Sequence, residues 1–158
     1  MNKADNIDDL KGHWKLEVFD GDNGPLLETI EGDNLIVTSG KGLLLDRLFS
    51  IAGFGGAINS MGIGNSATGA AIADTQLGGA TPVPVLQALD STPTRSGLVV
   101  TAVSTFGTTV ANQTWQELAL FNGTVNGTSV MLNRIAPIGP FTKTSAVSIV
   151  VTVTITQN

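Results

Sequence analysis

The most regular stretch of the chain lies near its end, where residues 146–156 read AVSIVVTVTIT. Aliphatic side chains occupy every second position from Val147 to Ile155, and most positions between them are Ser or Thr. Such alternation places the aliphatic side chains on one face of an extended strand and the hydroxyl side chains on the other. The stretch therefore predicts a long β-strand with one face in the core and a threonine-rich face suited to half-exposed packing on a neighbour.

Shorter stretches with strand character precede it and are separated by turn residues. Two Asn-Gly pairs, at 122–123 and 126–127, separate the predicted strands 114–121 and 130–135, and Asn-Gly is a strong hairpin signal. Further strands are predicted at 14–19, 26–30, 35–37, 58–64 and 98–103, with a turn at 31–34 between the second and third of these. Seven or eight strands without strand–helix–strand alternation predict an all-β fold, an antiparallel β-sandwich or jelly roll.

One segment has helical periodicity. Between Leu44 and Phe49 the apolar side chains recur at spacings of three and four residues, and glycines at 53 and 55 can end a helix. Thr38 or Ser39 can cap its start. We therefore expect one short helix over about residues 40–52 that covers one end or face of the sheet.

The ends and the middle of the chain divide it further. Residues 1–12 are polar, acidic and aperiodic, which is typical of an N-terminal arm. At 158 residues in total, the remaining segment 13–158 is expected to form a single β-sandwich domain. Residues 65–96 have no sustained period, and a loop of this length in a compact domain often serves as a contact surface.

Charge is distributed unevenly along the chain. The first 47 residues carry ten acidic and five basic side chains, whereas the remaining 111 carry only three of each. The net charge of −5 argues against nucleic acid as a partner. No run of 18 apolar residues predicts a membrane span, and the acidic start does not resemble a secretory signal. The weakly charged body is easiest to explain if partner subunits cover much of its surface.

Few residues in the chain can support catalysis. There is no Cys and only one His, His13, so thiol catalysis, disulfides and Cys-based zinc sites are excluded. We expect no enzymatic activity and no cofactor. Glu117 and Arg134 lie in the two strands joined by the Asn-Gly loop, and a hairpin centred near residues 125–126 would place them opposite each other. We interpret them as a structural ion pair.

One acidic segment has spacing that partly matches a calcium loop. Asp20, Asp22 and Glu31 stand at positions similar to those of an EF-hand, but Pro25 replaces the glycine that the sharp turn requires. An ordinary acidic hairpin turn is therefore favoured. A calcium- or carbohydrate-binding jelly-roll module remains an alternative function.

Several motifs follow one another in a familiar order. They are LIVTSGKGLLLDRL at 35–48, MGIGNS at 61–66, ADTQL at 73–77, TWQELALF at 114–121 and MLNR at 131–134, with Lys143-Thr144 ahead of the last strand. This order resembles a group of small virion proteins of tailed bacteriophages, described as capsid decoration (cement) or tail-associated proteins. The resemblance covers about residues 35–156. It departs from the group after the Leu77 turn, where many of those sequences carry an Arg and this chain has prolines.

The resemblance implies a virion structural protein, assembled in the host cytoplasm, that binds the outer capsid shell and stabilises it. Its partners would be the major capsid protein and further copies of itself in a homotrimer, with no nucleic acid or membrane partner. A phage tail or fibre component is the alternative of the same class. We expect the arm and the long loop to make the contacts, with these candidate residues: Asp5, Ile7, Leu10, Leu77, Pro82 and Pro84.

Overall fold

The computed structural model describes residues 10–51, 55–79 and 82–157, which contain eleven strands and one helix. Asp5 and Ile7, two of the predicted contact residues, lie outside this range. The elements are β1 (Leu10–Asp20), β2 (Leu26–Ile36), α1 (Thr38–Phe49), β3 (Ser60–Gly64), β4 (Val85–Ala88), β5 (Thr94–Ser96), β6 (Val99–Phe106), β7 (Thr114–Trp115), β8 (Glu117–Phe121), β9 (Met131–Ile135), β10 (Phe141–Thr142) and β11 (Val147–Gln157).

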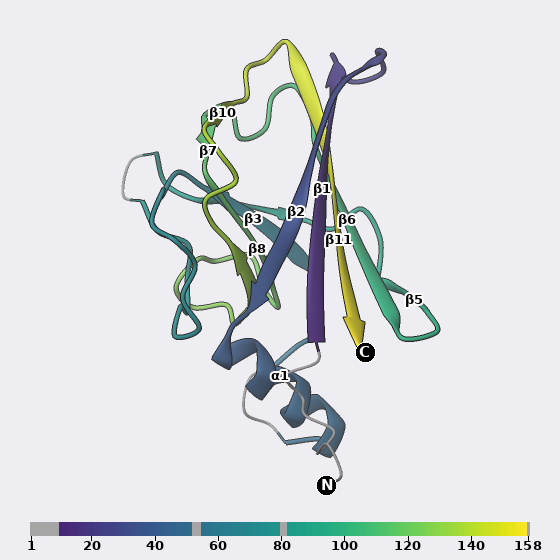
Figure 1. Ribbon diagram of the computed structural model, residues 1–158, viewed down its shortest axis with the longest axis vertical. Helices are drawn as coiled ribbons and strands as arrows, with labels where there is room; N and C mark the ends of the chain where they lie inside the picture. The colour runs from purple at the N-terminus through teal and green to yellow at the C-terminus, as the bar shows by residue number, and fades with distance from the viewer. Residues whose placement is uncertain (1–9, 52–54, 80–81, 158) are drawn as a thin grey trace, which may run out of the picture.

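Nine strands form one antiparallel sheet in the order β4-β3-β8-β9-β2-β1-β11-β6-β5, while β10 and β7 form a separate two-stranded ladder. Strand β2 joins the two halves of the sheet, because it pairs with β1 along most of its length and with β9 only through Leu35 and Ile36. The sheet therefore curls (Figure 1). A hydrogen bond from Ser104 Oγ of β6 to the carbonyl of Ala88 in β4 joins strands near its two edges. The predicted all-β class with one short helix is confirmed.

Strand β11 behaves as its sequence pattern predicts. It pairs along its whole length with β1, from Leu10 opposite Gln157 to Asp20 opposite Val147, and with β6 on its other side. The aliphatic face is fully buried at Ile149 and Val151, whereas the threonine face is half-buried. Fully burying one such aliphatic side chain stabilises the fold by about 1.5–3 kcal/mol.

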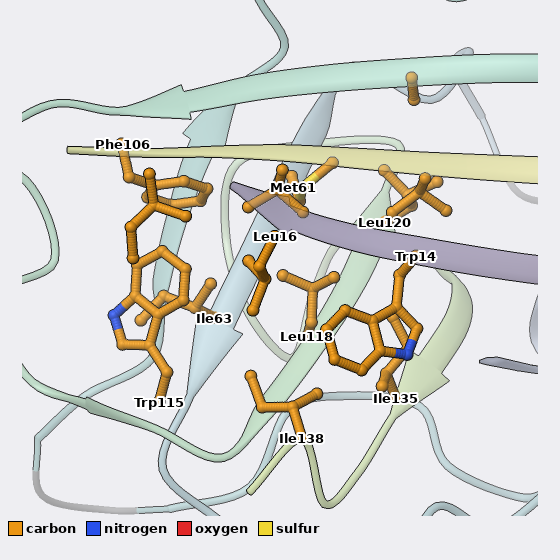
Figure 2. Close-up of a cluster of buried hydrophobic side chains, with 14 of the residues drawn as sticks. Trp14, Leu16, Met61, Ile63, Phe106, Trp115, Leu118, Leu120, Ile135 and Ile138 are labelled. Atoms are coloured by element: carbon orange, nitrogen blue, oxygen red, sulfur yellow. The ribbon is translucent and has the colours of Figure 1, made fainter. Parts of the chain in front are cut away.

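The main core combines side chains from both halves of the sheet. Figure 2 shows Trp14 and Leu16 of β1 in one cluster with Met61 of β3 and Leu118 and Leu120 of β8. At one end of the cluster, Phe106 meets Trp115 edge to face, with ring centroids 4.8 Å apart. The Trp115 indole N–H is satisfied by the carbonyl of Ala111.

The β3–β8–β9 half of the sheet is buried on both faces. A second cluster of Val37, Leu77, Ala119, Phe121 and Met131 packs on the face opposite the main core. Every residue of β3, β8 and β9 is therefore buried, which explains why their sequences are nearly continuous apolar runs rather than alternating ones. The segment that supplies Leu77 covers this outer face.

Two sequence predictions about the strands are wrong in detail. Residues 31–34 form no turn, because Gly32 lies against the indole of Trp14 and the indole N–H donates to the carbonyl of Asp33, which keeps β2 extended through Ile36. The predicted loop 65–96 contains strands β4 and β5. Strand β4 lies at an edge of the sheet, where the preceding prolines cost no ladder hydrogen bonds.

Helix α1 begins and ends earlier than predicted. Neither Thr38 nor Ser39 caps it through a side chain; Val37 holds the N-cap position, and Ser39 Oγ instead donates to the carbonyl of Met131. The helix ends at Ser50 in the left-handed conformation rather than at a glycine. Within the described ranges, no helix is long and apolar enough to cross a membrane.

Candidate functional site

The predicted ion pair between Glu117 and Arg134 is confirmed. Arg134 Nε and Nη2 donate to Glu117 Oε2 at 3.0 and 2.8 Å, and the side chains are 4% and 0% exposed for Arg134 and Glu117. The predicted register is wrong, since Arg134 pairs with Ala119 and Glu117 lies two residues further along the same face of β8. A bulge at Leu120/Phe121 accounts for one residue of this two-residue shift, and the ions meet diagonally.

Asp74 completes the ion pair as a third member. Arg134 Nη1 donates to Asp74 Oδ2 at 2.7 Å, and the Ala71 N–H donates to the same oxygen. Burial opposes ionisation of Asp74, but these two donors outweigh it and lower the pKa of the carboxyl below its ordinary value. Burial likewise disfavours the Arg134 charge, but Asp74 and Glu117 raise the pKa of the guanidinium.

The ion network of Glu117, Arg134 and Asp74 holds the segment 65–79 against the sheet. The Ser66 and Gly78 N–H groups donate to the two oxygens of Glu117, at 3.2 and 3.1 Å. Arg134 donates in the other direction, to the carbonyls of Thr68 and Gly69. The loop therefore obtains its shape from a buried charge cluster rather than from secondary structure.

Residues from four of the motifs that carry the phage resemblance meet at this network. Gly64 lies opposite Glu117 in the sheet, and a Cβ at Gly64 would overlap the Glu117 carboxylate. The Asp74 turn and the Arg134 strand supply the other two charges. We read this convergence as a structural role, because the Glu117 oxygens and the Arg134 nitrogens are all bonded to another member or to the loop backbone.

Leu77 was predicted to contact a partner, and its position contradicts that prediction. Its side chain is 1% exposed and packs in the second cluster, while its backbone N–H and carbonyl are both bonded to the Asn126 amide. The turn that carries it closes over the sheet, so the side chain faces inward. Pro82 is exposed and Pro84 half-buried just before β4, and Leu10 begins β1.

Helix α1 lies at one end of the sheet, which is one of the two predicted placements, but most of its apolar stripe faces outward. Only the beginning of the helix packs against the sheet. Gly40 lies so close to β9 that a Cβ there would overlap the carbonyl oxygen of Leu132, and Leu43 is the large helix side chain that is buried. Figure 1 shows α1 continuing past the ends of β1 and β11. On α1 and just after it, the large apolar side chains that are 39–74% exposed are Leu44, Leu45, Leu48, Phe49 and Ile51.

An apolar cavity of about 490 Å³ opens beside this helix. Leu44 of α1 and Leu10 of β1 line it, together with Val100 and Ile155 from the neighbouring strands, and Leu98 at its rim is largely exposed. Arg95 also lines it, with its guanidinium held by the carbonyl of Gly97. We define the end surface as the exposed apolar side chains on and just after α1, together with Leu98, Val100 and the cavity.

The carboxylates of the calcium-like segment do not come together. Asp22 accepts hydrogen bonds from the N–H and hydroxyl of Thr108, whereas Glu31 lies along β2, opposite Lys15 and 3.8 Å from His13. The part of the chain that the structure describes contains no group of three or more His, Asp or Glu residues placed to hold a metal ion. The segment is a hairpin whose acidic side chains have separate partners.

No protein-family model, curated protein or solved structure matches this chain. Function must therefore be inferred from its geometry together with the motif order. Sequence reasoning did not identify the cavity, since its lining comes from distant segments. It also missed Lys143, which is buried. The one sequence feature that could have indicated it is a lysine standing alone in a nearly uncharged region.

Proposed function

We propose that this chain is a virion structural protein, a capsid decoration protein that binds the outer capsid shell through the end surface. The observation that carries the proposal is the exposure of four large apolar side chains on α1, at positions 44, 45, 48 and 49, next to an apolar cavity. Soluble monomers rarely leave such contiguous apolar surface uncovered, and large patches of this kind mark interaction sites. The motif resemblance supplies the capsid as the partner.

We further propose that the curled sheet works as a β-sandwich of jelly-roll type. One layer would be β5, β6, β11, β1 and β2, and the other β9, β8, β3 and β4. The shared main core between them supports this view. Two layers packed face to face bury the apolar face of each in one core.

Charge distribution supports one contacting end. The exposed side of β2 carries Glu31 and Asp33, so that face is well solvated. Arg95 is the one cationic side chain among the residues that line the cavity, and Arg47 is exposed on α1 next to Leu48. Interface centres are depleted in charge and enriched in large apolar and aromatic side chains, which matches the end surface and not the acidic hairpin.

The mechanism would be mechanical rather than catalytic. Each copy would bridge neighbouring capsid subunits, and a homotrimer would join several of them at once. Added interface area lowers the free energy of the closed shell and opposes its expansion under internal DNA pressure. A standard interface buries about 800 Å² on each partner, so this binding would need the end surface and some of its surroundings.

Co-sedimentation with empty capsids tests the proposal. Leu48→Asp places a charge in the middle of the end surface and is expected to weaken capsid binding by at least about tenfold. Leu27→Asp is the matched control, because Leu27 is also an exposed leucine (57%) but lies at the opposite end of β2 from α1. Equal binding by both variants would refute the assigned surface.

Two further readouts separate the remaining alternatives. Binding to isolated tails but not to empty capsids would favour the tail or fibre function. Light scattering at micromolar concentration tests self-association, and a stable monomer in that experiment would contradict the homotrimer.

A further inference from the structure

Lys143 is a buried base whose hydrogen-bond partners are neutral. It follows β10 and is 1% exposed. Its Nζ donates to the backbone carbonyl of Gly107 and to the side-chain oxygen Oδ1 of Asn112, both at 2.8 Å. A buried ammonium normally has a carboxylate in direct contact, so this arrangement needs an explanation.

Burial lowers the pKa of Lys143, and the nearby Asp22 carboxylate offsets this only in part. A lower pKa increases the fraction of neutral amine at a given pH. The neutral amine is the nucleophilic form of lysine, and desolvation is a recognised way to activate it.

The amide of Asn112 is oriented toward this amine. Asn112 Nδ2 donates to the carbonyl of Thr108 at 2.9 Å, which turns Oδ1 toward Lys143. A nitrogen 2.8 Å from an amide oxygen lies about 3.6 Å from the amide carbon, given ordinary C=O lengths and hydrogen-bond angles. That separation is close to the distance of roughly 3–3.5 Å at which reacting atoms are productively placed.

We propose that Lys143 and Asn112 form a spontaneous intramolecular isopeptide bond. The Nζ lone pair attacks Cγ of Asn112, a new C–N bond forms, and the bond from Cγ to Nδ2 breaks. The amine loses one proton and the departing Nδ2 gains it, so that ammonia leaves and a secondary amide remains. The step needs no oxidant, reductant or co-reactant.

Asp22 is the carboxylate available to carry that proton. Both of its oxygens are anchored on Thr108, by the backbone N–H at 2.8 Å and the hydroxyl at 2.9 Å. The same residue receives the Asn112 amide, so one loop positions the carboxylate and the electrophile together. General acid–base transfer by a positioned carboxylate typically speeds such steps by about 10²–10⁴-fold.

The bond would tie the segment before β11 to the connection between β6 and β7. A covalent link between distant positions restricts the unfolded chain, as a disulfide does. This chain has no cysteine and so no disulfide, and the isopeptide bond would take the place of a disulfide as its covalent cross-link. The inference does not depend on the capsid function.

Mass spectrometry of the intact, denatured protein after prolonged incubation in the folded state tests the bond. We expect a mass below the sequence mass by one ammonia. Trypsin does not cleave after an acylated lysine, so the digest should contain residues 96–134 joined to residues 135–158. Lys143→Arg and Asn112→Ala should both restore the full mass, and Asp22→Asn should slow the loss of ammonia by at least about tenfold.

The controls separate this reaction from a common side reaction. Succinimide formation at an Asn-Gly pair also releases ammonia, but it would persist in Lys143→Arg and leave Lys143 cleavable. Asn112 is exposed, so Asn112→Ala should fold even if Lys143→Arg does not. A wild-type protein with the full sequence mass, or a mass deficit that survives in Asn112→Ala, would overturn the proposal.

Discussion

Arg134 and Lys143 are both buried cations that hold a loop by its carbonyl groups, yet their surroundings are opposite. Arg134 contacts two carboxylates as well as the carbonyls of Thr68 and Gly69, and its pKa is raised. Lys143 contacts two neutral oxygens, and its pKa is lowered. The same structural device thus raises the pKa of the cation in one place and lowers it in the other. Charge compensation, rather than burial, makes the difference.

The largest expected effect is at Arg134. Arg134→Met leaves Glu117 buried without its cation, and breaking a buried pair in this way costs about 3–5 kcal/mol. Urea denaturation should show that loss in the free energy of unfolding. Arg95→Met removes an arginine from the exposed rim of the cavity and should change stability by less than about 0.5 kcal/mol. Similar losses in the two variants would mean that the cluster is not stabilising.

Lys143→Met should cost less, about 1–3 kcal/mol, because the oxygens of Gly107 and Asn112 lose a donor but no carboxylate loses its direct partner. The reference is freshly purified wild-type protein that still has the full sequence mass, taken before the prolonged incubation in which the proposed cross-link forms. Thermal or urea unfolding provides the measurement. If Lys143→Met destabilises the protein as much as Arg134→Met, charge compensation does not distinguish the two sites.

The smallest effect is expected at Asp74, which is partly exposed. Asp74→Asn should cost about 1 kcal/mol near neutral pH. Because the folded pKa of Asp74 lies below its ordinary value of 3.8, its contribution is complete above that value and is lost as the pH falls through the folded pKa. The stability difference between wild type and Asp74→Asn should therefore shrink below about pH 3.8. A constant difference across that range would contradict the role of the Arg134 contact.

The sequence predicts features that depend on local pattern. The alternation of 146–156 identifies β11 and its buried face, and the Asn-Gly pairs identify the β8–β9 hairpin. The pairing of Glu117 with Arg134 follows from that hairpin. Its diagonal geometry does not, because it depends on the register and on the bulge at Leu120/Phe121, which no local pattern in the sequence indicates.

Other features depend on tertiary contacts that no local pattern contains. The turn-like residues 31–34 stay extended because Trp14, on the neighbouring strand, needs a glycine beneath its ring. The apolar stripe of α1 is visible in the sequence, but its outward direction follows from the tight contact of Gly40 with β9. The sequence places Leu77 in a loop, but its side chain is buried because the turn that carries it closes over the sheet.

The position of β1 between β2 and β11 has a consequence for the order of folding. Strand β2 follows β1 directly, so that hairpin can form early, whereas β11 is the last strand of the described chain. Until β11 arrives, the second edge of β1 has unpaired backbone groups and resembles the exposed edges through which proteins aggregate. Charged side chains on an edge strand discourage such contacts, and the outward side of β1 carries Lys11, Lys15 and Glu17. The concentration of charge in the first third of the chain would thus limit aggregation of the partly folded molecule until β11 pairs with β1.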